Sequence, residues 1–190
     1  MSVISDISLK RLPPHNLEAE QYVLGACFRS AEAFPKSLEI IDEDDFYKSG
    51  HARIFRCLRE LFESNQAIDI LTLSELLRQK NEIESVGGVE FLEYLEDLVP
   101  TAEAISFHAK IVREKKILRD LIETATEIAA SSFQDSEDVD LILDKAEQSI
   151  FRISEKRTKR SHYHIREVLK ESFVHIEKLF EKPGLVTGVA

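Results

Sequence analysis

Two stretches have residue types that could carry chemistry, an acidic run and a glycine pair, and neither has the spacing that a reaction site requires. The acidic run Asp42-Glu43-Asp44-Asp45 offers carboxylates to a cation, but consecutive side chains diverge, and the run lacks the ligand spacing and glycine of a Ca²⁺ loop. Gly87-Gly88 lacks both the GxGxxG pattern and the Lys-Ser/Thr ending of a phosphate-binding loop. We therefore expect a solvated acidic loop at the first place and a turn into a helix at the second.

Histidines and cysteines are the remaining candidates for a metal site or a reactive group. His162 and His164, with His175 further along, have no cysteine or carboxylate support and make a weak metal site. Cys27 and Cys57 both fall within helical patterns, and no signal peptide precedes them, so we expect buried, reduced thiols. An enzyme built on scattered carboxylates and histidines is the least favoured interpretation. We expect no catalytic residue, cofactor or metal site in this chain.

Composition favours a fold made of long helices. The 190 residues are 43% hydrophobic, which is enough for a core, and only 6 are glycine and 5 proline. Leu, Ile, Glu, Lys, Arg and Ala dominate, and few strand-like alternations appear. The predicted fold class is therefore all-α.

The charge is unevenly distributed along the chain. The net charge is −10, and residues 155–182 carry eight Lys/Arg against five Asp/Glu, which is +3 and leaves −13 for the rest. Such an acidic body is poorly suited to bind phosphates, so its expected partners are proteins. No apolar run approaches the ~18 residues of a membrane span, and we expect a cytoplasmic chain without membrane contact.

Helical periodicity and its interruptions divide the chain into segments. A tail (1–15) precedes a helical head (16–100), which begins at the good N-cap Asn16. Inside the head, Gly25 either permits close approach of another helix or is a tolerated accident, and Thr72-Leu73-Ser74-Glu75 is a capping-box pattern. Segments that follow the head are a protruding antiparallel helical hairpin (101–154), a basic linker (155–164), a linker helix (165–182) and a terminal segment (183–190).

The hairpin carries more apolar surface than two helices can bury against each other. The apolar band of its first helix covers roughly 140°, whereas one partner usually needs a stripe of about 100°. The surplus predicts contact with another domain or another chain. The residues that we assign to self-association are Phe107, Ile111, Leu118, Leu121, Ile122, Ala125, Ile128, Ile142, Ala146 and Ile150.

The linker helix is also amphipathic and follows a basic segment without apolar periodicity. Cations of that segment could contact nucleic acid, but a solvated interdomain linker is the favoured interpretation. A lone amphipathic helix after a linker needs a groove elsewhere. Its stripe, which we assign to docking on another chain or domain, is Ile165, Leu169, Phe173, Ile176 and Phe180.

The order of motifs resembles the N-terminal part of replicative DNA helicases of the DnaB type. The opening Pro13-Pro14-His15-Asn16-Leu17-Glu18-Ala19-Glu20 is followed by Leu24-Gly25, then by Asp45-Phe46-Tyr47 with His51 and Ile54-Phe55. Further matching motifs are Ile68-Asp69 with Thr72-Leu73, Val86-Gly87-Gly88 with Phe91-Leu92 and Leu95, Ile111-Val112, Leu118-Arg119 and Leu185-Val186-Thr187-Gly188-Val189. Their order and spacing are more specific than any one of them, and together they cover nearly all of 12–190.

This resemblance implies a collar that pairs through its hairpins on a hexameric ring, from dimer to hexamer. It also implies docking of primase, with a helicase loader as a further candidate partner, and a linker helix that docks on the neighbouring subunit's motor domain. In that family, 183–190 would lead into a RecA-like ATPase domain. No Gly-x4-Gly-Lys-Ser/Thr occurs here, so ATP, Mg²⁺, DNA contact and 5′-to-3′ unwinding would belong to the absent motor domain.

A second interpretation is a stand-alone helical adaptor of the same fold that was never fused to a motor. The coding sequence beyond Ala190 discriminates between the two. A phosphate-binding loop shortly downstream supports the helicase collar, and a natural stop codon supports the adaptor.

Overall fold

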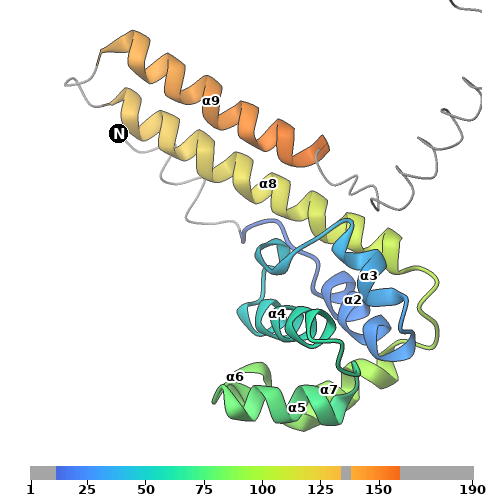
Figure 1. Cartoon of the computed structure of the whole chain (residues 1–190). Helices are drawn as coiled ribbons and strands as arrows, with labels where there is room; N and C mark the ends of the chain where they lie inside the picture. The colour runs from blue at the N-terminus through green and yellow to red at the C-terminus, as the bar shows by residue number, and fades with distance from the viewer. Residues whose placement is uncertain (1–11, 134–137, 159–190) are drawn as a thin grey trace, which may run out of the picture.

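The computed structural model describes residues 12–133 and 138–158, and every regular element in these two ranges is helical. The all-α prediction is therefore confirmed for this part of the chain. Figure 1 shows a head of short helices from which one long helix and its antiparallel partner extend. In chain order the elements are α2 (Leu17–Arg29), α3 (Ala33–Leu38), the 3₁₀ helix η1 (Glu43–Asp45), α4 (Ser49–Glu63), α5 (Ile70–Gln79), α6 (Ile83–Val86), α7 (Gly88–Leu98), α8 (Ile105–Ser132) and α9 (Val139–Thr158).

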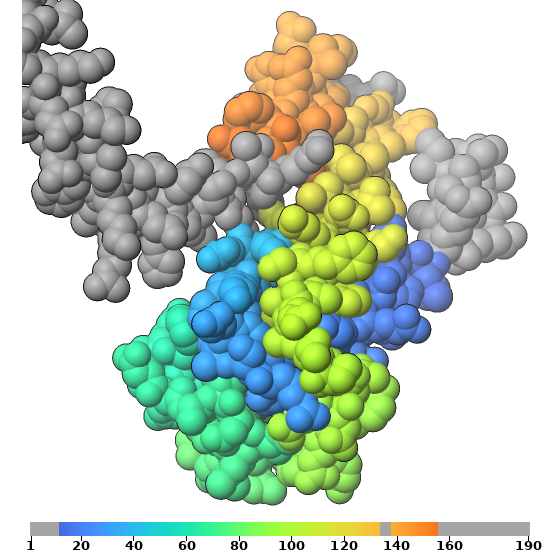
Figure 2. Space-filling model, turned by 90° about the vertical axis from the view of Figure 1, so that its right-hand side faces the viewer, coloured from blue at the N-terminus to red at the C-terminus, as the bar shows by residue number. Residues whose placement is uncertain are grey.

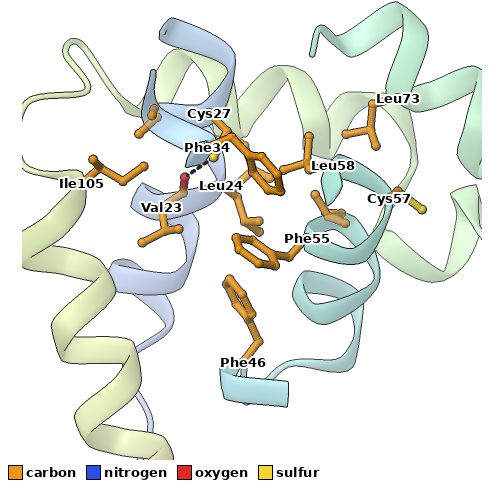
Figure 3. Close-up of a cluster of buried hydrophobic side chains, with 14 of the residues drawn as sticks. Val23, Leu24, Cys27, Phe34, Phe46, Phe55, Cys57, Leu58, Leu73 and Ile105 are labelled. Carbon is orange, nitrogen blue, oxygen red and sulfur yellow. Dashed lines mark hydrogen bonds between the residues drawn. The ribbon is translucent and has the colours of Figure 1, made fainter. Parts of the chain in front are cut away.

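The core of the head gathers apolar side chains from all of these helices except η1 and α9. Figure 3 shows Phe34 and Phe55 beside Leu24 and Leu58, and all four are fully buried. Cys27 belongs to the same cluster, where its thiol donates to the carbonyl oxygen of Val23 at 3.1 Å. Burial raises the pKa of Cys27 to about 12. Both cysteines are free and buried, as predicted.

Gly25 allows α2 and α7 to approach each other closely. A Cβ atom added at this position would overlap the carbonyl oxygen of Leu95 and lie 2.8 Å from the Val99 Cγ2 atom. Of the two interpretations that the sequence left open, the structure supports close helix packing. The helix begins as predicted, because the Asn16 side chain accepts a hydrogen bond from the backbone N–H of Ala19.

A buried carboxylate joins α2 to the start of α4. Glu20 is 1% exposed, and its oxygens accept hydrogen bonds from the backbone N–H groups of Tyr47 and Lys48. The His51 ring lies 2.8 Å from the same carboxylate and stacks on Phe91. A charged group without partners is costly to bury, so these contacts make the site tolerable and fix the spacing between the two helices.

The acidic run is not a solvated loop, and this part of the sequence prediction was wrong for Asp45. The Asp42 side chain caps η1, and the Asp45 carboxylate accepts a hydrogen bond from the Asp42 N–H, which completes a capping box. Asp45 is 1% exposed and forms an ion pair with Arg113 of α8. Asp44 remains exposed. The difference arises because the partner of Asp45 lies 68 residues further along the chain.

The predicted capping box at Thr72 was also wrong. Helix α5 begins at Ile70, and its N-cap is Asp69, whose carboxylate accepts a hydrogen bond from the Thr72 N–H at 2.8 Å. Thr72 therefore lies inside the first turn and contributes its backbone rather than its hydroxyl. Both residues are good caps by type, and Asp69 comes first in the chain.

Replacing the cap gives a first testable prediction. Asp69→Ala is expected to lower the free energy of unfolding by about 1 kcal/mol, because the Thr72 N–H loses its acceptor. The matched control Thr72→Ala keeps that N–H and should change stability by less than about 0.5 kcal/mol. Urea unfolding followed by circular dichroism measures both. A larger loss of stability for Thr72→Ala than for Asp69→Ala would show that Thr72 is the N-cap, as the sequence pattern predicted.

Candidate functional site: the apolar face of the helical hairpin

The hairpin consists of α8 and α9, and its first turns belong to the head. Figure 1 shows the two helices side by side and antiparallel, and Figure 2 shows them rising together above the head. Ile105, Ala109 and Val112 of α8 are buried in the head core, and Ile111 is half-buried against it. The remainder of α8 extends away beside α9. The projecting part is therefore shorter than the predicted hairpin segment.

Helix α9 ends later than the sequence pattern indicated. It continues to Thr158, four residues beyond the predicted end of the hairpin and into the stretch expected to be a basic linker. Glu, Lys and Arg are good helix formers, and neither glycine nor proline interrupts the stretch. Loss of apolar periodicity therefore marked the end of the apolar face and not the end of the helix.

The seam between α8 and α9 is only partly filled. Near the turn, a groove of about 250 Å³ is lined by Ile128, Ile142 and Ala146 together with polar residues. Nearer the head, a second groove of about 280 Å³ is lined by the ion pair Lys116–Asp120, by Arg152 and by other residues of both helices. Ile128, Ile142 and Ala146 are three of the predicted self-association residues. The structure places them at the internal seam of the hairpin.

The other predicted residues of α8 form an outer face. At about 100° per residue, Phe107, Leu118, Ile122 and Ala125 lie within about 60° of one another on the helix and opposite Lys116 and Asp120 of the seam. All four are exposed, with Phe107 at 64%. Leu121 extends the face, and it is also exposed. Large apolar side chains on one face of a helix indicate a surface that another molecule covers.

Helix α9 buries very little within a single chain. Among its residues 139–155, Ile153 alone is buried, whereas the predicted residue Ile150 is 53% exposed. Four further large apolar side chains of this helix are exposed, and the sequence assignment did not include them: Val139, Leu141, Leu143 and Phe151. Helical periodicity could have selected two of them, because Val139 and Leu143 share the stripe of Ile150. Leu141 and Phe151 lie off that stripe, and periodicity alone gave no reason to select them.

A helix with so little burial has weak support from its own chain. Isolated helices are marginal in water, and most helical stability in proteins comes from packing of an apolar face. The outer face of α8 together with the exposed stripe of α9 is hereafter called the hairpin face. Its residues are Phe107, Leu118, Leu121, Ile122, Ala125, Val139, Leu143 and Ile150. This surface can bind an apolar partner, and its residues offer no group for acid, base or nucleophilic chemistry.

Some predicted residues lie outside the part of the chain that the structure describes. They include the linker-helix stripe Ile165, Leu169, Phe173, Ile176 and Phe180, as well as the three histidines from His162 to His175. Within 12–133 and 138–158, no group of three or more His, Cys, Asp or Glu is placed to hold one metal ion. In the same ranges, no helix is both long enough and apolar enough to cross a bilayer.

The fold and the hairpin face define a class of protein: a small all-helical domain with a packed head and an exposed apolar hairpin. Comparison with known families makes the assignment more specific. Residues 12–114 match the family described as DnaB-like helicase N terminal domain. A crystal structure of the N-terminal domain of DnaB helicase from Mycobacterium tuberculosis superposes with a TM-score of 0.71 at 30% sequence identity, and covers 75% of this chain and 99% of that one.

Full-length relatives agree with this match. The chain is 34% identical over 186 residues to the replicative DNA helicase DnaB of Geobacillus stearothermophilus, and 36% identical over 186 residues to the replicative DNA helicase DnaC of Bacillus subtilis. Each alignment includes 98% of this chain and 41% of the relative. The chain belongs to the family of DnaB-like helicase N-terminal domains. It spans about two fifths of the length of these relatives.

Proposed function

We propose that this chain forms the N-terminal collar of a hexameric replicative DNA helicase and that the hairpin face joins its copies. The observation that carries the proposal is the exposure of α9, which buries only Ile153 among its residues 139–155. A second copy that presents the same face would cover the stripes of both helices. Such a self-complementary contact is the usual geometry of a homodimer, and a second, head-to-tail contact between dimers would be needed to close a ring.

The collar would serve as a docking platform for other replication proteins in the bacterial cytoplasm. Primase is the first proposed partner and a helicase loader is the second, on the strength of family membership. The parent protein would use ATP and Mg²⁺ in a RecA-like motor domain to unwind DNA from 5′ to 3′. The 190-residue sequence contains no Gly-x4-Gly-Lys-Ser/Thr motif, so this chain alone is expected neither to hydrolyse ATP nor to unwind DNA.

Sedimentation velocity tests the proposal directly. Over a dilution series of about a hundredfold, the average mass is expected to rise with concentration from the 21.8 kDa of one chain to that of a dimer and larger species. Because the hairpin face is apolar, moderate salt should leave this association largely intact. A chain that stays monomeric at the highest concentration would contradict self-association. Addition of primase to the same samples tests the docking role separately.

A further inference from the structure

The two helices of the hairpin receive very different support from the rest of the chain. The first turns of α8 place Ile105, Ala109 and Val112 in the head core, where all three are buried. One residue further along, Arg113 forms an ion pair with the buried carboxylate of Asp45. Helix α8 is therefore held by the head within a single chain, whatever covers its outer face.

A second polar contact extends this support along α8. Arg119 donates to the Asp45 carbonyl oxygen at 2.6 Å and to the Pro14 carbonyl oxygen at 2.9 Å. Arg113 and Arg119 are six residues apart, which is about 9 Å along the helix at ~1.5 Å per residue. Core packing and two arginine contacts thus fix α8 to the head as far as Arg119.

Helix α9 has much weaker support, and α8 is the main element that it contacts. The seam between the two helices contains the grooves of about 250 and 280 Å³ where packed side chains would otherwise lie. Ile153 is the one buried side chain among residues 139–155, and Ile142 and Ala146 are half-buried. Within a single chain, α9 therefore packs along one narrow edge.

The sequence of α9 does not compensate for this weak packing. Five of its 20 residues are β-branched: Val139, Ile142, Ile150, Ile153 and Thr158. Such side chains lose rotamer freedom in a helix, and Ala146 is the one alanine of α9. Even alanine-rich helices are marginal in water when no other surface covers them. Intrinsic propensity therefore adds little to the stability of α9.

We infer that α9 folds stably only when a second copy covers it, so that pairing of two chains and folding of α9 are one coupled step. The stripe that a second copy would cover is Val139, Leu143 and Ile150, which are 69%, 56% and 53% exposed. Pairing gives these side chains the burial that α8 alone does not provide. The inference rests on the proposed self-association through the hairpin face.

Coupled folding makes the folded hairpin a mark of assembly. A segment that becomes ordered on binding uses part of the binding free energy for its own ordering, which lowers the affinity of the pair. Single chains would then consist of a folded head and the supported part of α8, and paired chains would add α9. A protein that recognises folded α9 would therefore distinguish paired chains from single ones.

Hydrogen exchange measured by mass spectrometry tests the coupling on the whole chain. Samples are labelled across the dilution series in which sedimentation velocity identifies single and paired chains. In single chains, the amides of 139–155 should exchange within about tenfold of the rate of an unfolded peptide, because an uncovered helix is marginal. At a concentration about a hundred times the dissociation constant, linkage should slow this exchange roughly a hundredfold. Amides of α4 should stay protected throughout.

Two variants separate pairing from other effects of concentration. The double variant Leu118→Glu/Ile122→Glu should show fast exchange in α9 at every concentration, while α4 and the first turns of α8 stay protected. The control Ala130→Glu, at an exposed position outside the hairpin face, should follow the wild type. If α4 loses its protection in the double variant, the head is unfolded, and the wild-type dilution series decides alone.

The same series distinguishes failure of the coupling from failure of the proposed function. A chain that self-associates but protects α9 equally in single and paired forms would overturn the coupling and leave the hairpin face as the interface. A chain that stays monomeric at every concentration would contradict the proposed self-association, and the coupling with it.

Discussion

A chain in which Leu118 and Ile122 are both replaced by glutamate is expected to sediment as a monomer at concentrations where the wild type self-associates. The two side chains are 43% and 50% exposed and lie on the hairpin face. Burial of a large aliphatic side chain contributes about 1.5–3 kcal/mol in full, so covering their exposed parts contributes roughly half of that each. Glutamate removes this contribution and adds the cost of dehydrating an unpaired charge.

The expected loss is therefore at least about 3 kcal/mol, which weakens association roughly a hundredfold or more. Ala130→Glu is the control, because it adds one glutamate, half the charge of the double variant, at an exposed position of α8 outside the hairpin face. It should associate like the wild type. Ile111 is unsuitable for this test, because it packs against the head core and its replacement by glutamate would also destabilise the head. Unchanged association of the double variant would remove the hairpin face as the interface.

Gly25→Ala should destabilise the head strongly, although alanine is the better helix former. The added Cβ atom would overlap the backbone oxygen of Leu95, which cannot move aside as a flexible side chain would. Helices α2 and α7 would have to separate, and the fully buried Leu24 and Leu95 are part of the core that their contact closes. Overpacking of this kind costs up to about 3 kcal/mol, which outweighs the gain of about 1 kcal/mol in helix propensity.

Thermal unfolding measures this effect. For a domain of this size, a loss of about 2–3 kcal/mol corresponds to a decrease in Tm of roughly 5–10 °C. Gly50→Ala is the matched control, because a Cβ atom there would lie 3.4 Å from the Ser85 carbonyl oxygen and make ordinary contact. Its Tm should stay close to that of the wild type. Equal melting temperatures for the two variants would show that α2 and α7 tolerate a wider separation.

Local patterns in the sequence were sufficient to predict the all-helical fold class and several local features. Asn16 caps α2, both cysteines are buried, and the α8 stripe of Leu118 and Ile122 is exposed, as the periodicity and composition indicated. These features depend on residues within one or two helical turns of each other. The sequence could therefore indicate these local features, and the order of its motifs could indicate the family.

The tertiary structure decided which surfaces are covered and which polar groups are buried. From the sequence, Asp45 is predicted to be part of a solvated acidic run. In the structure it is buried, because α8 places Arg113, 68 residues further along the chain, against its carboxylate. The sequence alone does not show why position 25 is glycine. The structure gives the reason, because the backbone of Leu95 lies against it. Ile128 and Ile122 share an apolar band, but only the position of α9 places the first at the seam and leaves the second on the hairpin face. Periodicity fixes the faces of a helix, whereas burial depends on neighbours that the rest of the chain supplies.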